Sequence, residues 1–153
     1  MPGDTLTTLN LTSATLTSKP SAIRALVVHR NPEVARGLAI ILGAERGIEV
    51  TRTALTIPVG ASFARLEQPD VIILDGDMPA MSATWSMSYL RAAAPAARFV
   101  LLSSGTLERA PAENGVPSAE LVLATYPVEV LVQAVRRSTF RGSPSRILRS
   151  RAA

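Results

Sequence analysis

Short apolar runs along the chain alternate with stretches in which hydrophobic residues recur at helical spacing. Five runs, at residues 25–28, 48–53, 71–74, 99–102 and 121–123, have the length and composition of strands that are buried on both faces. Strands that alternate with helices at this spacing indicate parallel pairs joined by crossover helices. The pattern therefore predicts an α/β fold, a doubly wound five-stranded parallel sheet with helices on both faces.

Helices are expected in the intervals between these strands. Asn31 is suited to cap the first helix, Pro32 to open it, and Gly47 to close it. The last helix is expected to begin at Pro127. Proline and glycine residues within 106–118 limit any helix there to a short or irregular one. The residues expected to face the core at helical spacing are Val34, Leu38, Ile41, Leu42, Val59, Phe63, Leu66, Ala83, Met87, Leu90, Ala94, Val128, Leu131, Val132 and Val135.

Length and composition indicate one globular domain. The chain has 153 residues, of which 47% are hydrophobic, so it is long enough to bury a real core. We expect a flexible Thr/Ser-rich leader at residues 1–22, an ordered domain at 23–140 and an Arg-rich tail or linker at 141–153. The chain has no cysteine, no apolar run of membrane-spanning length and no signal-peptide pattern. We therefore expect a cytoplasmic protein without membrane contact.

The positive charge is concentrated near the C-terminus. The chain has 16 basic and 12 acidic residues, and the part beyond residue 135 holds six arginines and no acid. Three interpretations of these arginines stay open: weak contact with nucleic acid through phosphates, contact with an acidic protein surface, or a solvated linker. The arginines concerned are Arg136, Arg137, Arg141, Arg146, Arg149 and Arg151.

Polar side chains of the kinds that bind ligands or take part in catalysis are expected at one edge of the sheet. The third strand ends on Asp75, and ligands of open α/β sheets bind at the carboxyl ends of the strands. Ser103 or Ser104 with His29 and Asp75 would suggest a hydrolase triad, but no G-x-S-x-G nucleophile turn is present. The sequence also has neither the glycine-rich dinucleotide motif nor a P-loop. We therefore expect a protein that is not an enzyme.

Four segments together resemble the receiver domain of bacterial two-component response regulators. They are VIILDGDMP (71–79), LLSS (101–104), YPVEVLVQAV (126–135) and RALVVHRNPEVARGLAIIL (24–42), and the last resembles the subfamily with helix-turn-helix outputs. The resemblance covers about residues 23–140 and implies a flavodoxin-like fold. It places Asp75 at the phosphoacceptor position and Ser103 at the hydroxyl position that senses the phosphoryl group.

The chain departs from the receiver pattern where phosphoryl chemistry would occur. The two acidic positions after the first strand, which in that family help to hold Mg²⁺, carry His29 and Arg30. A guanidinium offers donors only, whereas Mg²⁺ requires oxygen ligands. The position of the family's lysine falls at or near Ala124. We therefore expect no metal and no cofactor, and Arg30 to fill the pocket by pairing with Asp75, a buried pair that would cost about 3–5 kcal/mol to break.

Several residues keep more than one interpretation. Asp75 is a working phosphoacceptor, a fixed salt-bridge partner or a cap of its strand. Asp77 is another oxygen donor of the pocket or a solvated loop acid, and His29 is a sensor of pH or a structural side chain. Trp85 and Tyr89, four residues apart on the third helix, form a contact patch or pack partly in the core.

The interpretation that these features favour is an atypical receiver-like signalling domain in transcriptional regulation. It would act by protein–protein contact or homodimerisation, through the last helix and fifth strand, without Mg²⁺-dependent phosphorylation of Asp75. The first alternative is a phosphorylatable single-domain response regulator that receives phosphate from a histidine kinase. The second is a small-molecule-sensing pseudo-receiver, for which an apolar pocket beside Asp75 would be the sign. The sequence leaves open whether a DNA-binding output domain belongs to the same protein.

Overall fold

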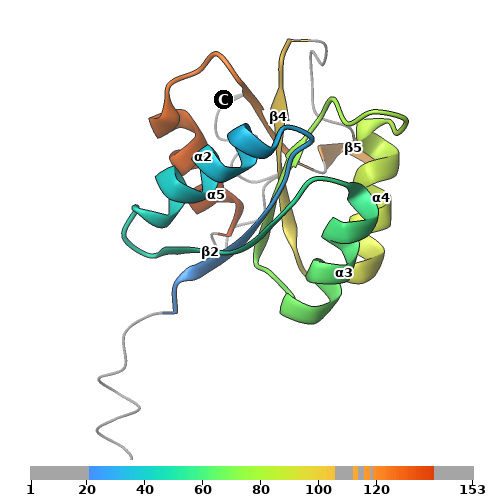
Figure 1. The fold of residues 1–153 in the computed structure, drawn as a ribbon, viewed down its shortest axis with the longest axis horizontal. Helices are drawn as coiled ribbons and strands as arrows, with labels where there is room; N and C mark the ends of the chain where they lie inside the picture. The colour runs from blue at the N-terminus through green and yellow to red at the C-terminus, as the bar shows by residue number, and fades with distance from the viewer. Residues whose placement is uncertain (1–20, 106–111, 114–115, 118, 140–153) are drawn as a thin grey trace, which may run out of the picture.

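A computed structural model describes residues 21–105, 112–113, 116–117 and 119–139. The predicted leader, most of the 106–118 segment and the tail beyond residue 139 lie outside these ranges. The main sheet has five parallel strands in the order β2-β1-β3-β4-β7, which confirms the predicted doubly wound fold (Figure 1). This order is that of flavodoxin-like sheets. The strands are β1 (Ile23–Val28), β2 (Ile48–Ala54), β3 (Val71–Asp75), β4 (Arg98–Ser103) and β7 (Glu120–Leu123).

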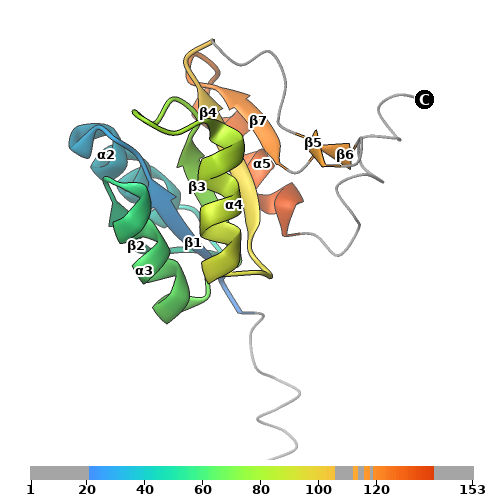
Figure 2. The ribbon, with the colours of Figure 1, turned by 90° about the vertical axis from the view of Figure 1, so that its right-hand side faces the viewer.

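Helices cover both faces of this sheet, as predicted. Helices α2 (Pro32–Gly43) and α5 (Val128–Ser138) lie on one face, and α3 (Ile57–Glu67) and α4 (Ala83–Ala93) lie on the other (Figures 1 and 2). Each face has its own apolar cluster. The alternate residues of the central strands supply both clusters, since side chains of a strand point to opposite faces in turn. Both faces of β3 are therefore buried, from Val71 to Asp75.

The start of α2 agrees with the sequence prediction, whereas its end does not. The Asn31 side chain accepts hydrogen bonds from the backbone N–H groups of Glu33 and Val34, as an N-cap does. The helix ends at Gly43 rather than at Gly47. Gly47 instead lies in the turn that leads to β2, with φ of 83°, a conformation that glycine adopts readily.

Of the three residues predicted to face the core on α3, Phe63 packs against it, whereas Val59 and Leu66 do not. Leu66 is 79% exposed and Val59 is also exposed, while the helix buries the small residues Gly60, Ala61 and Ala64 together with Ile57. The reason is a close approach between helix and sheet, since a Cβ atom on Gly60 would lie 2.9 Å from Cγ2 of Val28. Hydrophobicity alone selected the larger residues, but at Gly60 the spacing between helix and sheet leaves no room for a side chain.

The other helices agree more closely with the pattern. On α4, Ala83, Met87 and Leu90 are buried as predicted. On α5, Leu131, Val132 and Val135 are buried, whereas Val128 is exposed. On α2, Leu42 is buried, but Val34 and Ile41 are more than one-third exposed.

Outside these elements, β5 (Ala112–Glu113) and β6 (Val116–Pro117) pair antiparallel as a separate small sheet. The sequence predicted at most a short or irregular helix within 106–118, whereas these residues pair as strands. Within the described residues, no helix combines the length and apolar composition that crossing a bilayer requires.

Candidate functional site at the carboxyl edge of the sheet

The strand register brings the predicted site residues to one edge of the sheet. Val28, the last residue of β1, pairs with Leu74, so His29 and Arg30 follow directly beside Asp75. On the other side of β3, Asp75 pairs with Leu102, and Ser103 follows as the last residue of β4. Parallel strands end at the same edge, which explains why residues about 45 positions apart in the chain meet here.

The carboxylate of Asp75 is buried and held by its neighbours. Its side chain is 3% exposed. Oδ1 accepts a hydrogen bond from the backbone N–H of Asp77 at 2.9 Å, and Oδ2 accepts one from the backbone N–H of Arg30 at 3.4 Å. The guanidinium Nε of Arg30 lies 3.4 Å from the same Oδ2. Both oxygens therefore have protein donors.

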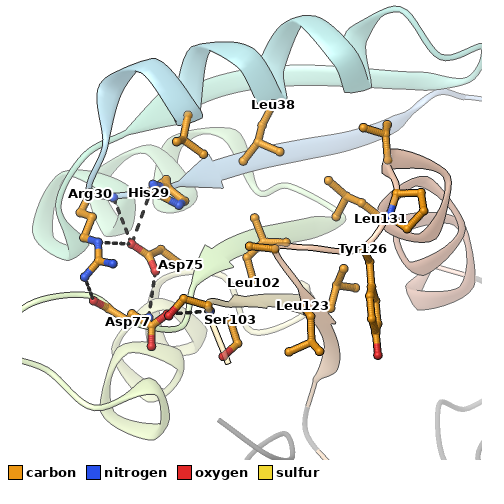
Figure 3. Close-up of a pocket in the computed structure, with 16 residues that line it drawn as sticks. His29, Arg30, Leu38, Asp75, Asp77, Leu102, Ser103, Leu123, Tyr126 and Leu131 are labelled. Carbon is orange, nitrogen blue, oxygen red and sulfur yellow. Dashed lines mark hydrogen bonds and ion pairs between the residues drawn. The ribbon is translucent and has the colours of Figure 1, made fainter. Parts of the chain in front are cut away.

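Arg30 connects the two loops at this edge. Besides its contact with Asp75, its Nη1 donates a hydrogen bond to the backbone carbonyl of Asp77 at 2.6 Å (Figure 3). The side chain is 49% exposed, however, so the ion pair is buried only on the side of the carboxylate. The predicted contact is present, but the expectation of a buried pair holds only for the carboxylate. Solvent screening reduces the free energy that the pair contributes.

His29 is neutral at the edge of the same site. Its Nδ1 accepts a hydrogen bond from the backbone N–H of Asn31 at 3.1 Å, so the ring proton belongs on Nε2. Burial lowers the pKa of His29, and Arg30 lowers it further, against the opposing effect of Asp75 and Asp77. Its 3.8 Å approach to Asp75 is therefore a contact of a neutral ring and not an ion pair near neutral pH.

The same tautomer argues against a hydrolase triad. In a Ser-His-Asp triad the histidine donates its Nδ1 proton to the acid and uses a bare Nε2 as the base. In His29 the Nδ1 atom is the acceptor and Nε2 carries the proton. The ring therefore cannot take a proton from Ser103 in this arrangement.

Ser104, which follows β4, and Asp77, which follows β3, bind each other across the edge. Oδ2 of Asp77 accepts hydrogen bonds from the backbone N–H of Ser104 at 3.0 Å and from its hydroxyl at 2.9 Å. The hydroxyl of Ser103, which is buried, accepts a hydrogen bond from the N–H of Gly105. Asp77 is therefore not a solvated loop acid, because its hydrogen bonds with Ser104 join the loop after β3 to the loop after β4.

A pocket of about 170 Å³ opens beside this polar group, between α2 and α5 (Figure 3). Asp75, Arg30, His29 and the two serines line one end of it, and the exposed Ala124 lies at its rim. The other walls are apolar side chains that the sequence assigned to the core or to no site: Val34, Leu38, Leu102, Val122, Leu123, Tyr126, Pro127, Val128 and Leu131. Val34 and Val128, each near the start of its helix, were predicted to face the core. They are exposed and line the pocket instead.

The arginines that the sequence singled out divide into two groups. Arg136 and Arg137 lie on α5, where they pair with Glu45 at 3.5 Å and Glu120 at 3.3 Å. Carboxylates of the same chain therefore already neutralise part of their charge. The other four, Arg141, Arg146, Arg149 and Arg151, lie outside the described residues.

Trp85 and Tyr89 lie on the opposite face of the molecule, on α4. Their rings stack with centroids 6.3 Å apart, and the side chains are 61% and 40% exposed. Neither residue belongs to the apolar cluster that α4 helps to form, which favours the contact patch over partial packing in the core.

Comparison with known proteins agrees with this geometry. No family model matches the chain. Over 88 residues, 58% of this chain and 41% of the relative, it is 34% identical to the transcriptional regulatory protein MctR of Rhizobium johnstonii. The match thus spans less than half of that relative's length.

Solved receiver domains superpose on most of the chain. The response regulator domain of Thermotoga maritima CheB has a TM-score of 0.65 at 19% identity and covers 80% of this chain and 99% of its own. The receiver domain of the putative response regulator NarL from Mycobacterium tuberculosis has a TM-score of 0.64 at 20% identity, covering 78% and 98%. A LuxR-family response regulator from Aurantimonas sp. SI85-9A1 has a TM-score of 0.64 at 21% identity, covering 76% and 84%. The chain therefore has the receiver fold of response regulators, and one stretch of it is related in sequence to a transcriptional regulatory protein.

Proposed function

We propose that this chain is a receiver-like signalling domain of a transcriptional regulator whose state does not depend on Mg²⁺-dependent phosphorylation of Asp75. It acts by contact with another protein or with a second copy of itself. The observation that carries the proposal is the Arg30 guanidinium, which occupies the side of Asp75 on which the receiver resemblance places an acidic pair.

The groups around Asp75 are unsuitable as ligands of Mg²⁺. The ion prefers six oxygen ligands in an octahedron, whereas Asp75 already accepts hydrogen bonds on both oxygens and faces a fixed cation. Oδ2 of Asp77, the next carboxylate, is bound to Ser104. Within the ranges that the structure covers, no group of three or more His, Cys, Asp or Glu side chains is placed to hold a metal ion. This arrangement argues against metal-assisted phosphoryl transfer, which relies on the ion for charge stabilisation.

The relation to MctR supports a role in transcription, and the receiver fold supports a role in signalling. The contact face expected from the sequence was α5 with β7. The apolar residues of α5 are mostly buried against the sheet, which leaves the edge strand β7 and the start of α5 for such contact. A homodimer through this face remains our proposal, and sedimentation velocity over a range of protein concentrations tests it.

Titration with beryllofluoride, a mimic of the aspartyl phosphate, tests the central claim. Amide NMR signals of residues near Asp75 are followed with and without Mg²⁺. We expect no Mg²⁺-dependent saturable shift in the wild-type chain, because the metal ligands are missing. The double variant His29→Asp/Arg30→Asp is the positive control, since it supplies two carboxylates at these positions. Saturable Mg²⁺-dependent shifts in the wild type would overturn the proposal and favour the phosphorylatable alternative.

A further inference from the structure

We propose that the pocket between α2 and α5 binds a small, neutral, mostly apolar molecule that carries one hydrogen-bond acceptor, such as a ketone or ester carbonyl. The inference deepens the proposed function and rests on it, because it names an input that would act in place of a phosphoryl group. Asp75 lies at the polar end of this pocket, and the apolar walls extend from there between α2 and α5.

The size and the walls of the pocket define the body of this molecule. Its volume of about 170 Å³ is smaller than a drug-sized site but sufficient for one ring, since an apolar cavity of about 150 Å³ binds benzene. The walls from β4, β7 and α5 include the apolar side chains of Leu102, Val122 and Leu131. Transfer of a ring or short alkyl group from water into such walls is favourable.

His29 supplies a hydrogen-bond donor at the polar end of the pocket. Nδ1 of His29 is occupied by the N–H of Asn31, so the Nε2 proton is the donor that the ring can offer to the pocket it lines. The His29 side chain is 14% exposed. A ligand oxygen that accepts from Nε2 would be partly shielded from water, which strengthens the hydrogen bond.

The charges at this end select a neutral head group. The carboxylates of Asp75 and Asp77 lie here with a single guanidinium, that of Arg30, which already contacts both residues. An anionic head would meet two carboxylates, and a cationic head would have to displace the donors that already hold both oxygens of Asp75. Desolvating either charge without a new partner is costly. A neutral acceptor avoids both penalties.

Occupation of this pocket would act on the face proposed for protein contact. The walls come from α2, from the ends of β4 and β7, and from the first turns of α5. A ligand between α2 and α5 therefore contacts the start of the same helix that borders the proposed interface. This places the input and the output of the domain on neighbouring side chains.

Three probes of similar size test the chemistry: acetophenone, ethylbenzene and benzoate. Methyl NMR spectra of the full chain report on Leu38, Val122 and Leu131. We expect saturable shifts with acetophenone, weaker binding of ethylbenzene, which lacks the acceptor, and the weakest binding of benzoate, which carries the negative charge. The loss of one hydrogen bond predicts about threefold to tenfold lower affinity for ethylbenzene.

Two variants and a matched control locate the binding. Ala124→Phe places a ring at the rim of the pocket and should reduce acetophenone affinity by at least about tenfold by filling part of a volume that holds one ring. Ala92→Phe, on the exposed surface of α4, is its matched control and should leave affinity unchanged. His29→Phe keeps a ring but removes the Nε2 donor, so acetophenone should lose its advantage over ethylbenzene. Thermal unfolding confirms that each variant is folded.

The outcomes separate this inference from the proposed function. Absence of saturable shifts with both neutral probes, or equal binding to Ala124→Phe, would overturn the ligand site. Equal affinity for acetophenone and ethylbenzene in the wild type, or tighter binding of benzoate, would overturn the neutral-acceptor assignment. If the ligand site fails while beryllofluoride with Mg²⁺ also has no effect, the proposed function stands without this input. A response to beryllofluoride with Mg²⁺ would overturn the proposed function whatever the probes do.

Discussion

Arg30 and Asp75, which are 45 positions apart in the chain, meet where β1 and β3 end, with Nε of the arginine 3.4 Å from Oδ2 of the aspartate. The aspartate is buried and the arginine is half exposed. The backbone N–H of Arg30 donates to the same oxygen, so Arg30 contacts this carboxylate through both its backbone and its side chain. The resemblance places an acid at the position of Arg30, and this exchange of charge underlies the proposed function.

Removal of the guanidinium should destabilise the fold moderately. For Arg30→Ala we expect a loss of about 1–2 kcal/mol in the free energy of unfolding, above the value for exposed pairs and below that for buried ones. The remaining backbone donors still satisfy Asp75, which limits the loss. Urea unfolding measures it. Arg36→Ala, an exposed arginine of α2 with no ion pair among the described residues, should change stability by less than about 0.5 kcal/mol. Equal effects of the two variants would contradict a structural role of the pair.

Acidification should destabilise the chain through His29, the only histidine of the sequence. Its folded-state pKa is lowered, chiefly by burial, whereas in the unfolded chain it titrates near pH 6.5, about the ordinary value. Its contribution to stability is fully present above that value. It falls as the pH decreases towards the folded-state pKa, because the unfolded state then binds more protons.

Urea unfolding at a series of pH values from neutral to about 5.5 tests this dependence on His29. The variant His29→Phe should show a flatter profile over the same range. A rise in stability on acidification would mean that the attraction of Asp75 exceeds the effect of burial, and that a charged His29–Asp75 pair forms.

Two glycines in helices should respond in opposite ways to alanine. Gly60→Ala should lower stability by about 1–2 kcal/mol, because its Cβ would lie 2.9 Å from the buried, β-branched Val28 and overpacking outweighs the gain in helix propensity. Gly37→Ala on α2 should raise stability by about 0.5–1 kcal/mol, since nothing lies within 4 Å of the added atom. Thermal unfolding of both variants measures the contrast. Stabilisation by Gly60→Ala would mean that α3 can move away from the sheet at little cost.

Ser86 buries a hydroxyl group that has no hydrogen-bond partner among the described residues. It is fully buried on α4, and an unsatisfied hydroxyl costs about 1–3 kcal/mol. Ser86→Ala should therefore raise stability by at least about 1 kcal/mol more than Ser88→Ala. Ser88 is exposed on the same helix, so its replacement supplies the same gain in helix propensity without removing a buried polar group. Loss of stability in Ser86→Ala would indicate a bound water or another partner of the hydroxyl.

The sequence determined the architecture, because the features that specify it are local. Five apolar runs of strand length, separated by helical intervals, allow few arrangements other than a parallel sheet covered on both faces. The cap at Asn31 and the position of Asp75 at the end of β3 follow from the same kind of evidence. Each depends on residues that are neighbours in the chain.

The tertiary structure alone decided how these elements approach one another. The distance between α3 and the sheet selects Gly60, Ala61 and Ala64 for the core instead of Val59 and Leu66, which no hydrophobicity pattern could specify. The proton position on His29 and the hydrogen bond from Arg30 to the carbonyl of Asp77 depend on the geometry of the loops. The pocket between α2 and α5 exists because the facing side chains of two helices that are distant in sequence do not fill the space between them at one end. Such features arise from packing between distant segments, and a local pattern carries no information about the space between them.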